Sequence, residues 1–506
     1  MAGFSKAVWI VALGKLALHV VSSARGYGFL GDELYYVACA AHPDLGYVDH
    51  PPLSIWILAA WQALLGDSLA ALRLLPALLG AGSVVLGGAL ARELGGGGPS
   101  QILTALVVAL APVNLVVHGY YSMNAVDILV WLAAFILVAR VLRDPTQGRF
   151  LALGTLLGVG LLNKISVLWL GAGLLVGLLV TPHRRVLRTP WPWMAGATAL
   201  LLALPHVVWQ IVNGWPTLEF IRVATGQKML PVPPLELFAQ QILVWSPLVL
   251  PVWLMGGVAL LLRRGDDPGR VFATVFATTA AILIANGTSR PNYLALAMPP
   301  LVAAGAIALE RLSLRPRRRW LMPVFTTLVA FFGLASAPLT LPILAVPDLI
   351  GLSAAIGLRA PEMENREVGA LDPHFANMLG WQEIVDTVAE VYRALPTRDR
   401  ARAGILAMSY SEAGAIDRFG SECGLPGAIS PHNSYWLWGT RGADGSVMVI
   451  AGGPRELWAQ HWGRIEEAAE WDCGHCPPGR NHSKVYVARD PRAPMDPIWA
   501  ALRRYD

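Results

Sequence analysis

The chain has 506 residues, of which 55% are hydrophobic and only 14% charged, and its mean hydropathy is +0.50. Soluble domains carry roughly 25% charged residues, so this composition excludes an ordinary soluble enzyme, and it equally excludes a disordered or collagen-like chain. A formal net charge of +5 is small for this length and gives no sign of a nucleic-acid partner. The remaining class is a polytopic α-helical membrane protein.

Several apolar stretches are long enough to enter a bilayer, where a span needs about 20 apolar residues, or fewer if protein covers its ends. In chain order they are residues 7–21, 69–90, 102–117, 125–142, 150–180, 191–209, 237–262, 271–285, 293–309 and 321–344. The first follows Lys6 and has no evident cleavage site, which favours a retained helix over a signal peptide.

The basic links between these stretches predict their orientation. The links are residues 140–149, 183–188, 263–270 and 311–319. By the positive-inside rule all of them are cytoplasmic. The stretch 150–180 lies between two such links and must cross twice, with its turn at Asn163 and Lys164. This reasoning predicts about 11 transmembrane helices, a cytoplasmic N-terminus, and an extracytoplasmic location for everything after residue 344.

From about residue 347 charged and small polar residues return. We therefore predict a transmembrane domain over residues 1–345 and an extracytoplasmic α/β domain over residues 346–506, an ordinary size for a domain. Alternating patterns predict strands in residues 403–408 and 446–450. Residues 384–395 and 455–471 are predicted to be helical.

The first polar feature in chain order is the acidic pair Asp32 and Glu33, just after the first helix and at the predicted outer surface. One interpretation is a solvated loop pair. The other is a carboxylate that takes a proton from an attacking hydroxyl.

A second feature is His50, which precedes Pro51 and Pro52. The prolines indicate an extended entry into a segment whose Trp56 and Trp61 are typical of a helix at the membrane interface. His50 is either a turn histidine or a group that contacts a phosphate or positions a carboxylate.

A third run, residues 118–127, lies at the outer end of two predicted helices and contains His118, Asn124 and Asp127. Asp127 is one turn into a strongly apolar helix, where an unpaired carboxylate is costly and therefore needs a partner or a task. Lys164 is either a snorkelling lysine or, at the outer face, a phosphate ligand.

Further cations lie in the predicted outer loops, among them Arg222, Lys228 and Arg290, the last close to Tyr293. Such an excess opposes the positive-inside trend and indicates a local anionic ligand, although any one of them can be an ordinary loop cation. Arginine suits forked contacts with phosphate. Carboxylates and cations that meet at one membrane face are the composition expected of a site for a lipid-linked phosphosugar.

These motifs together resemble the GT-C membrane glycosyltransferases of the protein-mannosyltransferase and aminoarabinose-transferase kind, that is, glycosyltransferase family 39 and its bacterial relatives. The resemblance covers about residues 7–344. The residues that carry it are Asp32-Glu33, His50-Pro51-Pro52, residues 121–127, Asn163-Lys164, residues 209–220 and residues 290–293. His50 stands where many members of the family carry lysine.

The resemblance implies an inverting transfer of a sugar from a polyprenyl-phosphate donor to a hydroxyl of a lipid, polysaccharide or protein acceptor, at the outer face of a bacterial inner membrane. Asp32 would be the general base, with Glu33 and Asp127 as further catalytic acidic residues. The implied substrate-binding residues are His50, Lys164, Arg222, Arg290, Tyr293, Asn124 and His118. No metal-ligand set is predicted, and members of the family differ over a divalent metal.

The predicted outer domain adds two patterns. Residues 432–439, rich in aromatic and amide side chains, form either a sugar-stacking surface or a packed core. Cys473-Gly474-His475-Cys476 is either half a zinc site or part of a disulfide, and the pairing among Cys423, Cys473 and Cys476 stays open.

Two other functions remain as alternatives. A secondary transporter would need ionisable residues near mid-membrane and related halves, neither of which the sequence displays. A membrane scaffold with an outer interaction domain would leave Asp127 unexplained. The identities of the sugar and the acceptor and the oligomeric state are not encoded in any pattern that we recognise.

Overall fold

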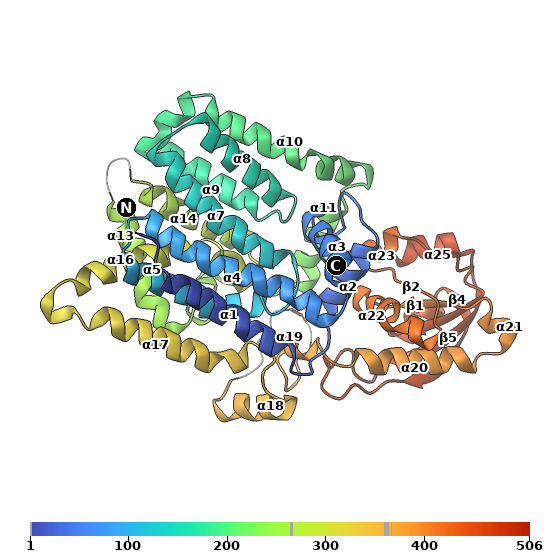
Figure 1. Cartoon of the computed structure of the whole chain (residues 1–506). Helices are drawn as coiled ribbons and strands as arrows, with labels where there is room; N and C mark the ends of the chain where they lie inside the picture. Colours follow the sequence, from blue (N-terminus) through green and yellow to red (C-terminus); the bar gives the residue numbers. More distant parts are fainter. Residues whose placement is uncertain (1–2, 264–266, 359–363, 366) are drawn as a thin grey trace.

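The computed structural model describes residues 3–263, 267–358, 364–365 and 367–506. A bundle of apolar helices forms one side of the molecule, and a sheet with its own helices forms the other (Figure 1). The C-terminus returns to the junction between these two parts (Figure 1). A mostly helical chain with a C-terminal sheet is therefore confirmed, while the division at residue 345 stays a prediction.

The bundle is built from apolar helices that differ in length. They are α1 (Ala7–Ser23), α4 (Leu69–Glu93), α5 (Gly98–Leu110), α6 (Pro112–Val117), α7 (Met123–Arg143), α8 (Gln147–Leu161), α9 (Val167–Val180), α10 (Trp191–Val212), α13 (Leu250–Leu262), α14 (Gly269–Asn286), α16 (Pro299–Ser313) and α17 (Leu321–Ser336). Among the described residues, 5 helices are long and apolar enough to cross a membrane, or 7 if each sharply bent pair is one span. The count of about 11 stays a prediction that rests on the basic links.

Two predicted stretches are broken by proline. The stretch 102–117 divides before Pro112, where α5 ends and α6 begins. The stretch 237–262 is not one straight helix, because α12 (Pro234–Val244) and the helical segment after it meet at an angle of 102°, as in a broken span or a re-entrant loop. Ser246 there has a φ of 75°, and Pro247 follows. Proline restricts the residue before it and cannot continue a helix, so the chain turns.

The turn predicted within residues 150–180 is confirmed, since α8 ends at Leu161 and α9 begins at Val167, while the two membrane crossings stay a prediction. Asn163 and Lys164 lie in the turn between them. The stretch 293–309 is divided between the short α15 (Pro291–Ala295) and α16.

Shorter helices complete this part of the chain and carry some of the polar motifs, such as Asp32 and Glu33. They are α2 (Gly31–Ala41), α3 (Leu53–Leu65), α11 (Pro216–Val223), α12, α15 and α18 (Val346–Ala355). Trp56 and Trp61 lie on α3, as the sequence predicts.

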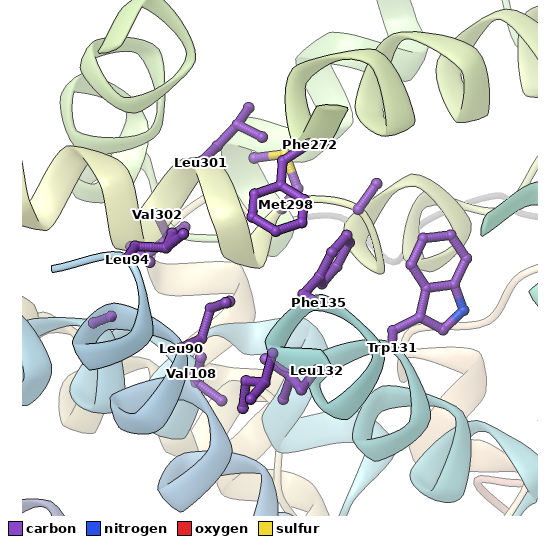
Figure 2. Packing of buried hydrophobic residues seen from close by; sticks show 14 of the residues in the cluster. Leu90, Leu94, Val108, Trp131, Leu132, Phe135, Phe272, Met298, Leu301 and Val302 are labelled. Atoms are coloured by element: carbon purple, nitrogen blue, oxygen red, sulfur yellow. The ribbon is translucent and has the colours of Figure 1, made fainter. Parts of the chain in front are cut away.

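The bundle core is a continuous cluster of buried aliphatic and aromatic side chains. The Phe135 ring of α7 packs edge-on against Trp131 of the same helix and Phe272 of α14, with ring centroids 5.9 and 5.5 Å apart (Figure 2). Helices α13 and α16 approach each other closely at Gly256 and Gly305, where an added Cβ would overlap the backbone of the facing helix. Small residues allow this approach between apolar helices.

The C-terminal part contains a five-stranded sheet in the order β2-β1-β3-β5-β4. Its strands are β1 (Gly404–Ala407), β2 (Ala428–Ile429), β3 (Val447–Ala451), β4 (Trp462–Glu470) and β5 (Lys484–Pro491). Strand β1 is parallel to β2 and β3, whereas β5 is antiparallel to β3 and β4. Its helices are α19 (Pro373–Ala376), α20 (Trp381–Ala394), α21 (Thr397–Arg400), α22 (Tyr410–Phe419), α23 (Ser434–Leu437), α24 (Arg455–Ala459) and α25 (Met495–Leu502).

The strands predicted in residues 403–408 and 446–450 and the helix predicted in 384–395 are confirmed by β1, β3 and α20. The helix predicted over 455–471 is wrong, because α24 ends at Ala459 and β4 follows. Strand β4 pairs along its length with β5, and this long-range pairing overrides the helical propensity of its Glu and Ala residues.

Candidate functional site

Asp32 lies in the first turn of α2. This helix lies at the junction between the bundle and the sheet-containing part (Figure 1). The Asp32 side chain is half-buried, and its Oδ1 accepts a hydrogen bond of 3.0 Å from the Tyr410 hydroxyl of α22. A carboxylate in the first turn of a helix is stabilised by the helix dipole. Asp32 therefore has both a supporting hydrogen bond and partial access to solvent.

Glu33 is fully buried, unlike its neighbour. Its Oε2 lies 3.0 Å from Nη2 of Arg73 in α4, and its oxygens also accept the backbone N–H groups of Leu30 at 2.8 Å and Tyr121 at 3.1 Å. Arg73 in turn donates to the carbonyl of Gly28 at 2.7 Å. These contacts fit an anchor for the α2 N-terminus better than a group that touches a substrate.

His50 is buried among tyrosines. Its ring centroid lies 4.7 Å from that of Tyr36 and 5.0 Å from that of Tyr47, and its Nδ1 lies 3.0 Å from the Pro51 carbonyl. Its buried Nε2 has no hydrogen-bond partner within the described residues and lies 3.9 Å from Asp49 Oδ1. The imidazole is thus placed to support Asp49.

Asp49 is a candidate that the sequence reasoning missed. Its Oδ1 accepts a hydrogen bond of 2.8 Å from the Tyr35 hydroxyl of α2, and its carboxylate interacts electrostatically with Tyr36, as that of Asp32 does. Its position beside His50 in one loop was the available signal. Asp32 and Asp49 therefore lie on the same side of the junction, around Tyr36.

Asp127 is fully buried in α7 and has the partner that its position requires. The Ser166 hydroxyl contacts both carboxylate oxygens, at 2.8 and 2.7 Å, and Lys164 Nζ lies 3.5 Å away. Lys164 also donates to Asn124 Oδ1 at 2.6 Å, and its Nζ lies 5.0 Å from the centroid of the Tyr293 ring. The turn between α8 and α9 is thereby docked on α7.

Arg290 precedes α15 and pairs with Glu364. Burial by itself lowers the pKa of the guanidinium, but neighbouring acidic groups, chiefly Tyr293 and Glu364, raise it above its ordinary value. Asp32 is among the groups whose negative charge acts on Arg290. Arg290 therefore interacts electrostatically with Asp32 and also with Tyr293, whose ring lies beside Lys164.

A cavity opens beside Lys164, with an empty volume of about 460 Å³ that includes space open to solvent. Asn124, Lys164 and Asn292 are polar groups in its wall, and apolar side chains such as Trp131 and Trp245 form most of the remainder. A site of this kind can hold an amphiphile whose anionic group lies at the ammonium and whose apolar part contacts the aromatic walls.

Two of the predicted substrate-binding residues, His118 and Arg222, lie outside this group of polar side chains. His118 lies beside His19 of α1, with ring centroids 6.4 Å apart, and its Nδ1 lies 2.7 Å from the Asn114 carbonyl. Arg222 is exposed on α11, and within the described ranges its side chain has no hydrogen bond or ion pair. Neither is brought to the cluster formed by Asn124, Asp127, Lys164 and Tyr293.

The cysteines give no sign of a zinc site. Cys473 and Cys476 form a disulfide, while Cys39 and Cys423 are free thiols. In the part of the chain that the structure describes, no group of three or more His, Cys, Asp or Glu side chains could hold a metal ion.

The aromatic run 432–439 packs rather than forming an open sugar surface. Tyr435 is 1% exposed, and the Trp438 ring stacks on His42 of the loop after α2, with centroids 4.2 Å apart. This run therefore joins the sheet-containing part to the bundle.

Comparisons with known proteins agree with this arrangement. The model of the family described as dolichyl-phosphate-mannose-protein mannosyltransferase matches residues 49–209. The lipid A galacturonosyltransferase RgtD of Rhizobium johnstonii is 24% identical over 296 residues, which are 57% of this chain, and the match spans 61% of that relative's length.

The structure of ArnT from Cupriavidus metallidurans bound to undecaprenyl phosphate superposes with a TM-score of 0.63 at 14% identity, covering 95% of this chain and 97% of that one. The apo structure of the same protein gives 0.63 at 13% identity and covers 98% of each chain.

The match over residues 49–209 and the RgtD similarity agree with the resemblance to membrane glycosyltransferases that the sequence predicts. The fold of this chain is similar to that of ArnT over nearly its whole length.

Proposed function

We propose that this protein transfers a sugar, with inversion, from a polyprenyl-phosphate donor to a hydroxyl acceptor at the outer face of a bacterial inner membrane. The observation that carries the proposal is a half-buried carboxylate, Asp32, whose charge acts on Arg290, while Arg290 also interacts with Tyr293, the ring beside Lys164. The reaction needs a base for the acceptor hydroxyl and cations for the leaving phosphate, and these residues are of those two types.

The donor's phosphate would be held by Lys164 and Arg290, and its first isoprene units by the apolar wall beside Trp131 and Trp245. Charge-assisted hydrogen bonds to phosphate are among the stronger polar contacts available to a protein. As the bond between the anomeric carbon and the phosphate oxygen breaks, the phosphate leaves with the electron pair, and the cations stabilise its growing charge.

Asp32 would act on the acceptor. One carboxylate oxygen takes the hydroxyl proton while the acceptor oxygen forms its bond to the anomeric carbon. A single displacement of this kind needs no covalent intermediate with the protein, and inversion follows. Asp127 would act at a distance, by holding Lys164 and the turn that carries it. Asp49 would help to hold α2, the helix that carries Asp32, through its contacts with Tyr35 and His50.

The relatives support the classes of donor and acceptor. ArnT binds undecaprenyl phosphate, and RgtD acts on lipid A. A lipid-linked acceptor is therefore the first class to test, ahead of polysaccharide and protein. The positive-inside pattern supports an extracytoplasmic site and a cytoplasmic N-terminus.

The test uses the full-length protein in nanodiscs, with a panel of undecaprenyl-phosphate sugars and lipid A as the first acceptor. We expect transfer by the wild type, a loss of transfer in Asp32→Asn, and normal transfer in the control Asp386→Asn, an exposed carboxylate of α20. Full activity of Asp32→Asn would remove the proposed base. No transfer by the wild type from any donor to lipid, polysaccharide or protein would refute the function itself.

A further inference from the structure

The sheet-containing part contributes a side chain to the proposed general base. Tyr410 is the first residue of α22, and its hydroxyl donates to Asp32 across 378 positions of sequence. A capping box fixes this turn, because Ser409 Oγ accepts the N–H of Glu412 at 3.3 Å and Glu412 Oε2 accepts the N–H of Ser409 at 3.0 Å. The backbone that carries Tyr410 is therefore well defined.

The Tyr410 ring is held between two other rings. It stacks on Tyr35 with centroids 4.4 Å apart, and it packs against His432 at the same distance. His432 Nδ1 accepts the N–H of Tyr410 at 3.3 Å, and its Nε2 lies 3.0 Å from the carbonyl oxygen of the last residue, Asp506. His432, held by Asp506, thus supports the ring that carries the hydroxyl.

The two helices that carry the pair meet at glycines. A Cβ on Gly31 would lie 2.8 Å from Ser411 Oγ, and a Cβ on Gly414 would lie 3.0 Å from the backbone of Leu34. Helices α2 and α22 therefore pack closely (Figure 1). Any sliding of α22 would displace the hydroxyl from Asp32.

Three other groups interact electrostatically with Asp32, one of them from its own helix. They are Arg290 before α15, Tyr36 on α2 and Tyr120 before α7. Arg290 also pairs with Glu364 and, in the proposed function, with phosphate. Within the described ranges, Tyr410 is the side chain that hydrogen-bonds Asp32.

We propose that Tyr410 is a positioning residue for the general base, so that the sheet-containing part completes the active site. Its hydroxyl holds Oδ1 of Asp32 and leaves Oδ2 to accept the proton of the acceptor. This inference rests on the proposed function. Small misplacements of a catalytic group can reduce the rate by about 10²-fold. Because the Tyr410 hydroxyl only orients the base, we expect a smaller loss.

The test is Tyr410→Phe, which keeps the ring between Tyr35 and His432 but removes the hydroxyl. We expect kcat to fall roughly 10-fold, as for the loss of one hydrogen bond to a charged group. KM for the donor should stay unchanged, because the donor's phosphate is bound by the bundle. The matched control is Tyr435→Phe, which removes the same hydroxyl from Asp417, 2.9 Å away in the same part of the chain.

Wild-type kcat in Tyr410→Phe would overturn the inference. So would an equal fall in Tyr435→Phe, since both would then act by loosening the domain, or a rise in donor KM that accounts for the whole effect. Thermal unfolding of both variants checks that they fold. An inactive wild type would instead refute the proposed function, so the two failures are distinguishable.

Discussion

The buried pair of Arg73 and Glu33 allows the sharpest stability prediction. Both side chains are almost inaccessible to solvent, and Arg73 also donates to the Gly28 carbonyl. Changing Arg73 to methionine removes the cation and leaves the buried Glu33 charge with only its two backbone N–H donors. Breaking a buried ion pair in this way costs about 3–5 kcal/mol of folding free energy.

The double variant Arg73→Met/Glu33→Gln removes the orphaned charge and should recover a large part of that loss, since an ion pair replaced on both sides is often close to neutral. The control is Arg149→Met, which breaks an exposed pair with Asp144. Exposed pairs contribute about 0–1 kcal/mol.

The assay is thermal unfolding of the full-length protein in one detergent. Within one protein the shift in Tm scales with the free-energy change. Arg73→Met should therefore lower Tm at least about three times as much as Arg149→Met does. Equal shifts for the two single variants, or a double variant no more stable than Arg73→Met, would refute the assignment of Glu33 as a buried anchor.

Three further outcomes are expected. Lys164→Met should raise donor KM about 10-fold or more, since a charge-assisted contact is lost; an unchanged KM in a donor titration would count against the phosphate role. Replacing both Cys473 and Cys476 with serine should cost about 2 kcal/mol by the chain-entropy argument for so short a loop. Chemical denaturation measures this, with the free thiol Cys423→Ser as a near-neutral control. Burial lowers the pKa of His432, so the unfolded chain binds this proton more readily. Stability should therefore fall as pH drops below about 6.5, and His432→Gln should flatten that fall in a Tm-against-pH series; parallel curves would contradict it.

Local composition determined the class of the protein and several details of its membrane part. Hydropathy and the basic links predicted the bundle and the break at Asn163 and Lys164, because both depend only on short stretches of sequence. The expectation that Asp127 needs a partner followed from the cost of burying a charge. The short motifs, taken together in their order along the chain, were sufficient to suggest the resemblance to a family.

Only the tertiary structure decided which partners these residues have. Neighbouring residues on a helix point about 100° apart, so Asp32 could face the junction while Glu33 faces the core, a choice set by the position of Arg73 in α4. Ser166 as the partner of Asp127, and Tyr410 as the partner of Asp32, depend on packing between segments distant in sequence. Periodicity and propensity report only on near neighbours along the chain, which is also why β4 was mistaken for a helix.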